Sequence, residues 1–201
     1  MTGTKPFVIG LTGSMGMGKS TTADMFRELG AAVWDADAAV HKMYDVGGAA
    51  VAPLGALCPA AILDGKVDRG VLKDWIAKDD TALGQIEGVV HPLLEQDRSA
   101  FLAGLDTDIA VLDFPLLFEA GAENLVDLVV VVSAAPDVQR QRLLARGEMD
   151  SAMLETILAK QMPDAEKRAR ADRVIKTETL EGAREAVRKL ISEIQEGLRH
   201  A

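Results

Sequence analysis

Eight consecutive residues near the start of the chain match a phosphate-binding loop. The run at 13–20, GSMGMGKS, fits the pattern G-x-x-x-x-G-K-[ST]. Its glycines allow backbone torsions and a close approach that a Cβ would obstruct, so successive N–H groups can converge on one phosphate. The lysine can reach the β- and γ-phosphates, and the serine hydroxyl can ligate Mg²⁺. The residues expected to hold the nucleotide are Gly13, Gly16, Met17, Gly18, Lys19, Ser20 and Thr21.

Two carboxylates, Asp35 and Asp37, follow a second apolar run and lie two residues apart. Side chains with this spacing point to the same side of an extended chain, so the two groups can share one site. We expect Asp37 to accept the proton of an acceptor hydroxyl and Asp35 to serve the metal, with the reverse assignment open. Asp113, at the end of a later strand, competes with Asp35 for the metal role. Alternatively, Asp37 simply caps a helix that begins at Ala38.

Arginines recur in a polar, helical segment at 136–170, which we expect to form a lid. Arg142 and Arg146 are four residues apart and therefore share one helical face. In phosphoryl transfer the charge on the transferred group is stabilised by cations, so Lys19 and Arg142 are candidate catalytic residues, and Arg142 and Arg146 candidate nucleotide ligands. The alternative for both arginines is a solvated basic face.

These residues need a scaffold, and the apolar pattern predicts an α/β fold with an open, parallel, five-stranded sheet flanked by helices. In such sheets ligands collect at the carboxyl ends of the strands, where the loop and the aspartates fall. The final segment has the apolar spacing of an amphipathic helix. The strands are expected at 7–11, 31–34, 109–112, 128–132 and 173–175, with helices at 21–29 and 180–198.

The interval between the second and third strands is far longer than the dozen or so residues that a crossover needs. We therefore predict one fold over 1–201 with a helical, substrate-binding insertion at 38–105; the alternative is an extra helical layer without a ligand. Helices are expected there at 38–45, 69–78, 81–89 and 92–105.

Composition and charge restrict the kinds of molecule that this protein is expected to bind. The 201 residues are 48% hydrophobic and 26% charged with a formal net charge of −9, which disfavours a general nucleic-acid or anionic-membrane surface. No apolar stretch approaches the roughly 18 residues of a membrane span. The single cysteine, Cys58, forms no intrachain disulfide, and we expect no signal peptide. We predict a cytoplasmic protein, a monomer or weak homo-oligomer, that binds neither nucleic acid nor membrane.

A phosphate loop alone is shared by GTPases, oligomeric ATPases and small-molecule kinases. The residues after the late strands lack the Asn/Thr-Lys-x-Asp pattern that reads guanine, and the carboxylate pair supplies what a kinase needs near the γ-phosphate. A kinase that uses ATP and Mg²⁺ is therefore favoured. A kinase for another small hydroxyl compound, such as a nucleotide or nucleoside, and a nucleotide-dependent switch without a small acceptor remain alternatives.

Motifs along most of the chain resemble dephospho-CoA kinases. They are GLTG at 10–13 with the glycine loop, LGA at 29–31, DAD at 35–37, HP at 91–92, PLLFE at 115–119, Gln161 and ADRVI at 171–175. The resemblance implies a core, a CoA-binding helical domain and a lid. It implies transfer of the ATP γ-phosphate to the ribose 3′-hydroxyl of dephospho-CoA.

The same resemblance implies roles for individual residues. Asp37 falls on the family's catalytic aspartate, and Arg69, His91 and Glu119 fall near the substrate. Three positions depart from the family pattern. Ser14 and Met17 stand where glycine and serine are usual, and Thr177 stands where an asparagine usually follows the last strand.

Overall fold

The computed structural model describes residues 5–145 and 161–200. The chain divides into two compact units. The first, here the nucleotide unit, comprises residues 1–34 and 105–201, and the second, here the helical unit, comprises residues 35–104. Each unit is described separately below.

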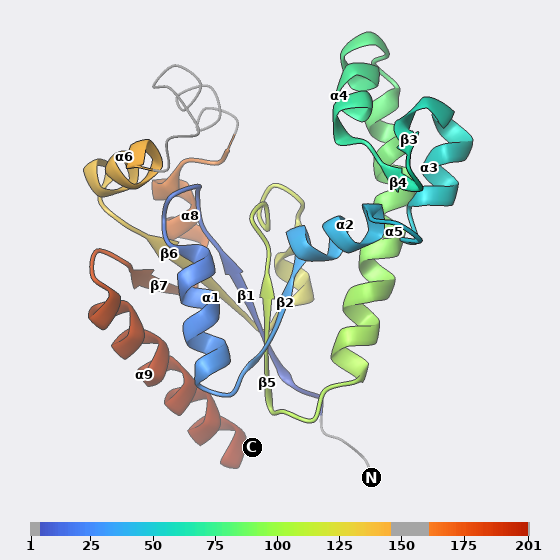
Figure 1. The fold of residues 1–201 in the computed structure, drawn as a ribbon. Coiled ribbons are helices and arrows are strands. Elements are labelled where there is room, and N and C mark those ends of the chain that lie inside the picture. The colour runs from blue at the N-terminus through green and yellow to red at the C-terminus, as the bar shows by residue number, and fades with distance from the viewer. Residues whose placement is uncertain (1–4, 146–160, 201) are drawn as a thin grey trace. The chain divides into compact units, whose positions relative to one another are not determined.

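The nucleotide unit contains a five-stranded sheet with the strand order β2-β5-β1-β6-β7 (Figure 1). The pairs β1–β5, β1–β6 and β6–β7 are parallel, and Leu11 of β1 lies opposite Asp113 of β5. The strands are β1 (Phe7–Thr12), β2 (Ala32–Asp35), β5 (Ile109–Asp113), β6 (Leu128–Ser133) and β7 (Arg173–Lys176). All five predicted strands are confirmed, each to within one residue at either end.

Helices connect and cover these strands. Helix α1 begins at Lys19, two residues before the predicted start, and α9 begins at Leu180 as predicted. The remaining helices of the described part of this unit are short. The helices are α1 (Lys19–Glu28), η2 (Ala122–Leu125), α6 (Pro136–Ala145), α8 (Asp164–Arg170) and α9 (Leu180–Arg199).

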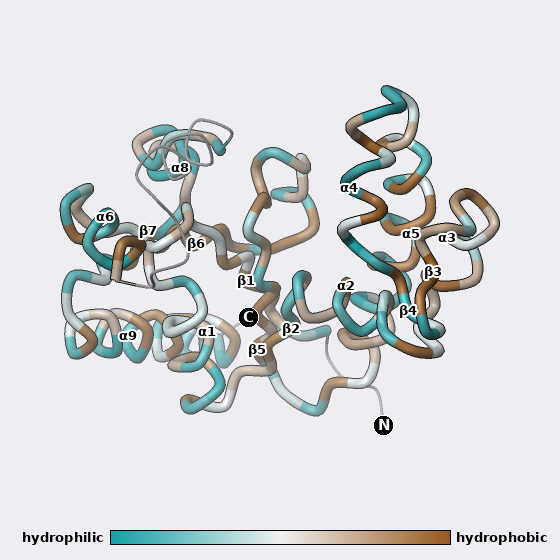
Figure 2. Tube along the Cα trace, turned by 45° about the horizontal axis from the view of Figure 1, so that its top comes forward, coloured by the Kyte–Doolittle hydropathy of each residue, from teal (hydrophilic) through white to brown (hydrophobic). Residues whose placement is uncertain are grey.

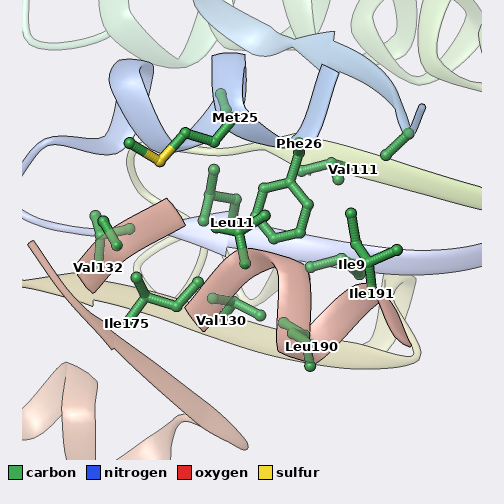
Figure 3. Close-up of a cluster of buried hydrophobic side chains, with 14 of the residues drawn as sticks. Ile9, Leu11, Met25, Phe26, Val111, Val130, Val132, Ile175, Leu190 and Ile191 are labelled. Atoms are coloured by element: carbon green, nitrogen blue, oxygen red, sulfur yellow. The ribbon is translucent and has the colours of Figure 1, made fainter. Parts of the chain in front are cut away.

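One face of the sheet forms the main core with α1 and α9 (Figure 3). Phe26 of α1 and Val187 of α9 are fully buried there. Along α9 hydrophobic and hydrophilic residues alternate with the turns (Figure 2), as expected of an amphipathic helix. The strand side chains on this face come from alternate positions, as the pleat requires: Ile9, Leu11, Ile109, Val111, Val130, Val132 and Ile175.

The opposite face is covered by the segment that follows β5. Leu117 and Phe118 of this segment pack against Val129 and Val131 of β6. The three central strands β1, β5 and β6 are therefore buried along nearly their whole length, which explains their nearly continuous apolar sequences.

Gly13 lies where the chain leaves β1, in close contact with β6. An added Cβ would lie 2.8 Å from the Val132 carbonyl oxygen, too close for real atoms. We expect Gly13→Ala to lower the free energy of unfolding by about 1–3 kcal/mol, because the strands must move apart. Urea unfolding measures this. Gly197→Ala on α9 is the control: its Cβ meets nothing within 4 Å, so unchanged or slightly higher stability is expected. Equal effects of the two substitutions would contradict the prediction.

The helical unit consists of helices and one short hairpin. Its elements are α2 (Ala36–Tyr44), α3 (Val51–Leu57), η1 (Pro59–Ala61), β3 (Ile62–Leu63), β4 (Lys66–Val67), α4 (Arg69–Lys78) and α5 (Ala82–Ala103). Helix α4 has the predicted bounds. Helix α3 and the antiparallel pair β3–β4 were not predicted.

Helix α5 corrects another prediction. Two helices were expected, separated before Pro92, but a single helix of 22 residues runs through this proline. Pro92 removes the N–H that would bond the carbonyl of Gly88, and Gly88 is exposed, so water can satisfy that carbonyl.

None of the helices within 5–145 and 161–200 combines the length and the apolar sequence that a membrane span requires.

Candidate functional site

The glycine loop joins β1 to α1 in the geometry of a phosphate cradle. Gly16 and Gly18 have φ angles of 80° and 87°, a left-handed conformation that favours glycine, and Gly18 is the N-cap of α1. The first N–H groups of a helix have no partners within it, and they add to its positive dipole end. The amides at Lys19 and Ser20 therefore suit an anionic oxygen.

The two residues that depart from the usual loop sequence fit this conformation. Among the described residues, Asp64 is the only non-glycine with positive φ, so Ser14 needs no special torsion. Met17 donates its N–H to the Ser14 carbonyl at 3.1 Å, and its side chain is buried. The amide of Met17, expected to contact phosphate, therefore serves the turn of the loop in this structure.

Lys19 and Asp113 form an ion pair beside the loop. Asp113 is only 1% exposed and ends β5, next to β1. The ammonium group of a lysine has three donors, so one can hold this carboxylate while the others face phosphate. Of the two carboxylates considered for the metal, Asp113 is the one in the nucleotide unit.

A cavity of about 310 Å³ adjoins the loop at Gly16 and Gly18. Arg142 donates to the carbonyl and, at 3.2 Å, to the hydroxyl of Thr177, and that hydroxyl donates to the Met17 carbonyl at 2.7 Å. Thr177 thus ties Arg142 to the glycine loop. Arg146, the second predicted lid arginine, lies outside the described residues. The cavity is lined by Gly16, Gly18, Thr21, Thr22, Met25, Arg142, Ala145, Thr177, Thr179, Leu180 and Ala183.

Glu119 lies in the nucleotide unit, in the segment after β5. Its carboxylate accepts from the Lys167 ammonium at 2.9 Å and from the Met162 amide at 3.0 Å. Burial acts to raise the pKa of Glu119, but these hydrogen bonds outweigh it and hold the pKa below its ordinary value. Its expected contact with substrate stays a prediction.

This lowered pKa predicts how stability depends on pH. Because the folded pKa lies below the unfolded one, the contribution of Glu119 is complete above the unfolded pKa and is lost as pH falls through the folded pKa. We expect wild type to exceed Glu119→Gln in free energy of unfolding by a constant amount above about pH 5, with the difference shrinking below that. Urea unfolding at pH 7, 5, 4 and 3 measures it. A difference that stays constant down to pH 3 would contradict the prediction.

The helical unit has a cavity of about 470 Å³ lined by Asp37, Ala38, Val40, His41 and Arg69. Asp37 lies exposed in the first turn of α2, with His41 one turn later. A carboxylate, an imidazole and a guanidinium therefore border one hollow, a suitable set of groups for a polar, anionic substrate.

Two contacts beside this cavity involve Asp35 and Arg69. The Asp35 side chain accepts from the Ala38 amide at 2.9 Å and caps α2, so the alternative in which Asp37 is the cap is wrong. The Arg69 guanidinium lies 5.5 Å from the centroid of the Tyr44 ring. Burial raises the pKa of the Tyr44 phenol and outweighs the opposing charge of Arg69, so the ring stays neutral beneath the cation.

The structure brings some of the predicted site residues to a common cavity and leaves others elsewhere. His91 is exposed on α5 and is not among the residues that line the Asp37 cavity. His41 was not included in the predicted site, although its spacing of four from Asp37 on a helix was a usable signal. Thr177 and Gln161, noted in the sequence without a contact assigned, bind the loop through Met17 and Met15. Lys167 was not predicted, and it contacts Pro115 and Glu119 through tertiary contacts, for which local sequence carries little signal.

Comparison with known proteins identifies the family of this chain. A family model described as dephospho-CoA kinase matches residues 7–181. A dephospho-CoA kinase of Cereibacter sphaeroides is 58% identical over 192 residues, covering 96% of this chain and 98% of that protein.

Solved structures agree in fold. The crystal structure of TT1252 from Thermus thermophilus matches with a TM-score of 0.83 and 32% identity, covering 94% of this chain and 98% of that one. A dephospho-CoA kinase from Campylobacter jejuni matches with a TM-score of 0.63 and 24% identity, covering 95% and 98%. The glycine loop, the parallel sheet and the full-length similarity together show that this chain belongs to the dephospho-CoA kinase family.

Proposed function

We propose that the protein transfers the γ-phosphate of ATP to the ribose 3′-hydroxyl of dephospho-CoA, giving coenzyme A and ADP. The observation that carries this proposal is the glycine loop with its Lys19–Asp113 pair, in a chain that matches the family along almost its whole length. The loop and the start of α1 hold the phosphates, and Lys19 neutralises charge on the transferred group.

The cavity beside the loop suits the adenine of ATP. Met25, Leu180 and Ala183 offer apolar contact to a flat base, and the Arg142 guanidinium is planar and held by Thr177. Arg142 therefore has two proposed roles: it contacts the nucleotide, and it supplies a positive charge near the phosphates. The same role for Arg146 rests on its spacing in the sequence.

The residues beside the loop fit Mg²⁺. Ser20 offers a hydroxyl and Asp113 a carboxylate, and among the described residues no cluster of three or more His, Cys, Asp or Glu side chains forms a complete metal cage. Mg²⁺ typically uses one or two protein oxygens together with water and substrate phosphates, so this sparse set is suitable. Bound there, the ion supplies charge neutralisation on the phosphates. Asp35 stays a second candidate for positioning it.

On the acceptor side, we assign substrate binding to the cavity in the helical unit. Arg69 can bind the diphosphate of dephospho-CoA, and Asp37 can accept the proton of the reacting hydroxyl. His41 borders the same cavity and adds a donor. Contacts of His91 and Glu119 with the substrate are implied by the family resemblance alone.

A comparison of acceptors tests the proposal. ADP release from MgATP is measured with dephospho-CoA, adenosine or AMP, and the product is identified by mass spectrometry. Stimulation by dephospho-CoA alone, with coenzyme A as product, is expected. Equal stimulation by adenosine or AMP would favour a kinase for other small hydroxyl compounds, and slow hydrolysis unaffected by any acceptor would favour a nucleotide switch.

A further inference from the structure

The side chain of Lys167, on α8, is completely buried. Lysine is almost never fully buried unless it is paired, because removing an ammonium ion from water is costly. Its ammonium contacts the Glu119 carboxylate at 2.9 Å and the Pro115 carbonyl at 3.4 Å. Both partners lie in the segment after β5, and neither ATP nor an acceptor is needed to explain the contacts.

The Glu119 contact leads to the glycine loop. The carboxylate that pairs with Lys167 also accepts from the Met162 amide, which adjoins Gln161. The Gln161 side chain in turn accepts from the Met15 amide, inside the loop, at 3.2 Å. The ion pair thus anchors the backbone next to a residue that holds the loop.

The Pro115 contact leads to the same loop by a second route. The carbonyl that faces the Lys167 ammonium also accepts from the Thr12 hydroxyl at 3.2 Å. Thr12 ends β1 and directly precedes the loop. The Gln139 side chain, on α6, donates to the Met15 carbonyl at 2.7 Å. The backbone N–H and carbonyl of Met15 are therefore both held by glutamine side chains, the N–H by Gln161 and the carbonyl by Gln139.

We propose that Lys167 is a positioning residue for nucleotide binding, which acts through Glu119 and Gln161 to hold the glycine loop in the shape that receives the phosphates. Here both contacts of the ammonium lead to residues that bracket the start of the loop. Any effect of Lys167 on phosphate transfer to dephospho-CoA rests on the proposed function, but its effect on nucleotide binding does not.

A double-mutant cycle tests this coupling. The equilibrium affinity for Mg²⁺ with the non-hydrolysable analogue AMP-PNP is measured by calorimetry, without acceptor, for Lys167→Met, Gln161→Ala and the double variant. Each single substitution should weaken binding about tenfold, and the double should weaken it little more than either alone, because both remove the same restraint. Lys189→Met, on an exposed lysine of α9, is the control and should bind as wild type does.

The outcomes separate positioning from simple stabilisation. If Lys167→Met lowers the melting temperature but leaves AMP-PNP affinity unchanged, or if the two effects are fully additive, the proposal is wrong. Should Lys167→Met fail to fold, Lys167→Met combined with Glu119→Gln replaces it in the cycle, because this pair of substitutions removes both charges of the ion pair and leaves no buried ion uncompensated. The same non-additivity is then expected.

Kinetics give a second measurement. A variant that is only less stable contains less active enzyme, so its apparent kcat falls while its KM for ATP does not change. Lys167→Met should instead raise the KM for ATP about tenfold in folded protein, matching its loss of affinity. Absence of activity with dephospho-CoA in wild type would overturn the proposed function and leave the binding cycle interpretable.

Discussion

Lys19→Ala is expected to lower kcat by about 10²–10³-fold, because it removes a donor aimed at charge that develops on the transferred phosphoryl group. The KM for ATP should rise less, since backbone amides of the loop and α1 still hold the phosphates in the ground state. Initial rates over a range of ATP concentrations, with saturating dephospho-CoA, measure both constants.

This substitution also affects stability, which must be separated from catalysis. Removing Lys19 leaves the buried Asp113 carboxylate without its cation, a change that typically costs about 3–5 kcal/mol. The double variant Lys19→Ala, Asp113→Asn also removes the buried negative charge and should recover much of that loss. Its kcat should stay low. If the folded double variant regained a kcat within tenfold of wild type, Lys19 would be structural rather than catalytic.

Asp37→Asn is expected to lower kcat by about 10²–10⁴-fold, since the amide cannot accept a proton from the acceptor hydroxyl. Asp37 is exposed, so the fold should keep its stability. AMP-PNP affinity should not change, because that residue is assigned to the acceptor. Rates at saturating substrates and calorimetry measure the two quantities.

Asp35→Asn is a matched comparison for this prediction. Asparagine caps helices about as well as aspartate, so α2 keeps its start while the charge is lost. A larger loss of kcat from Asp35→Asn than from Asp37→Asn would reverse the two assignments. Asp74→Asn, on an exposed residue of α4, should leave both constants as in wild type.

The centre of the sheet was predictable because β1, β5 and β6 are buried on both faces and are short, nearly unbroken apolar runs in the sequence. Hydrophobic sequence reports burial directly in such strands. The β3–β4 hairpin was missed because each strand has two residues, too few for any periodicity. Its signal was the Asp64-Gly65 turn, where both residues have positive φ.

The candidate site was predictable only in part. The glycine loop is a local motif, so sequence alone located it. Lys167 could not be assigned in this way, because its partner Glu119 is 48 positions away and only the folded chain brings the two together. The continuity of α5 through Pro92 depends on hydration of one exposed carbonyl, a property that helix propensity does not include.

The helical unit is a continuous stretch of chain that leaves the sheet after β2 and returns at β5, two strands that are neighbours in the sheet. A much shorter crossover would suffice to join such strands. If the acceptor binds in the helical unit, as proposed, genetic exchange of this single stretch alters the choice of acceptor and leaves the glycine loop unchanged. Chimaeras between related kinases have natural junctions at its two ends.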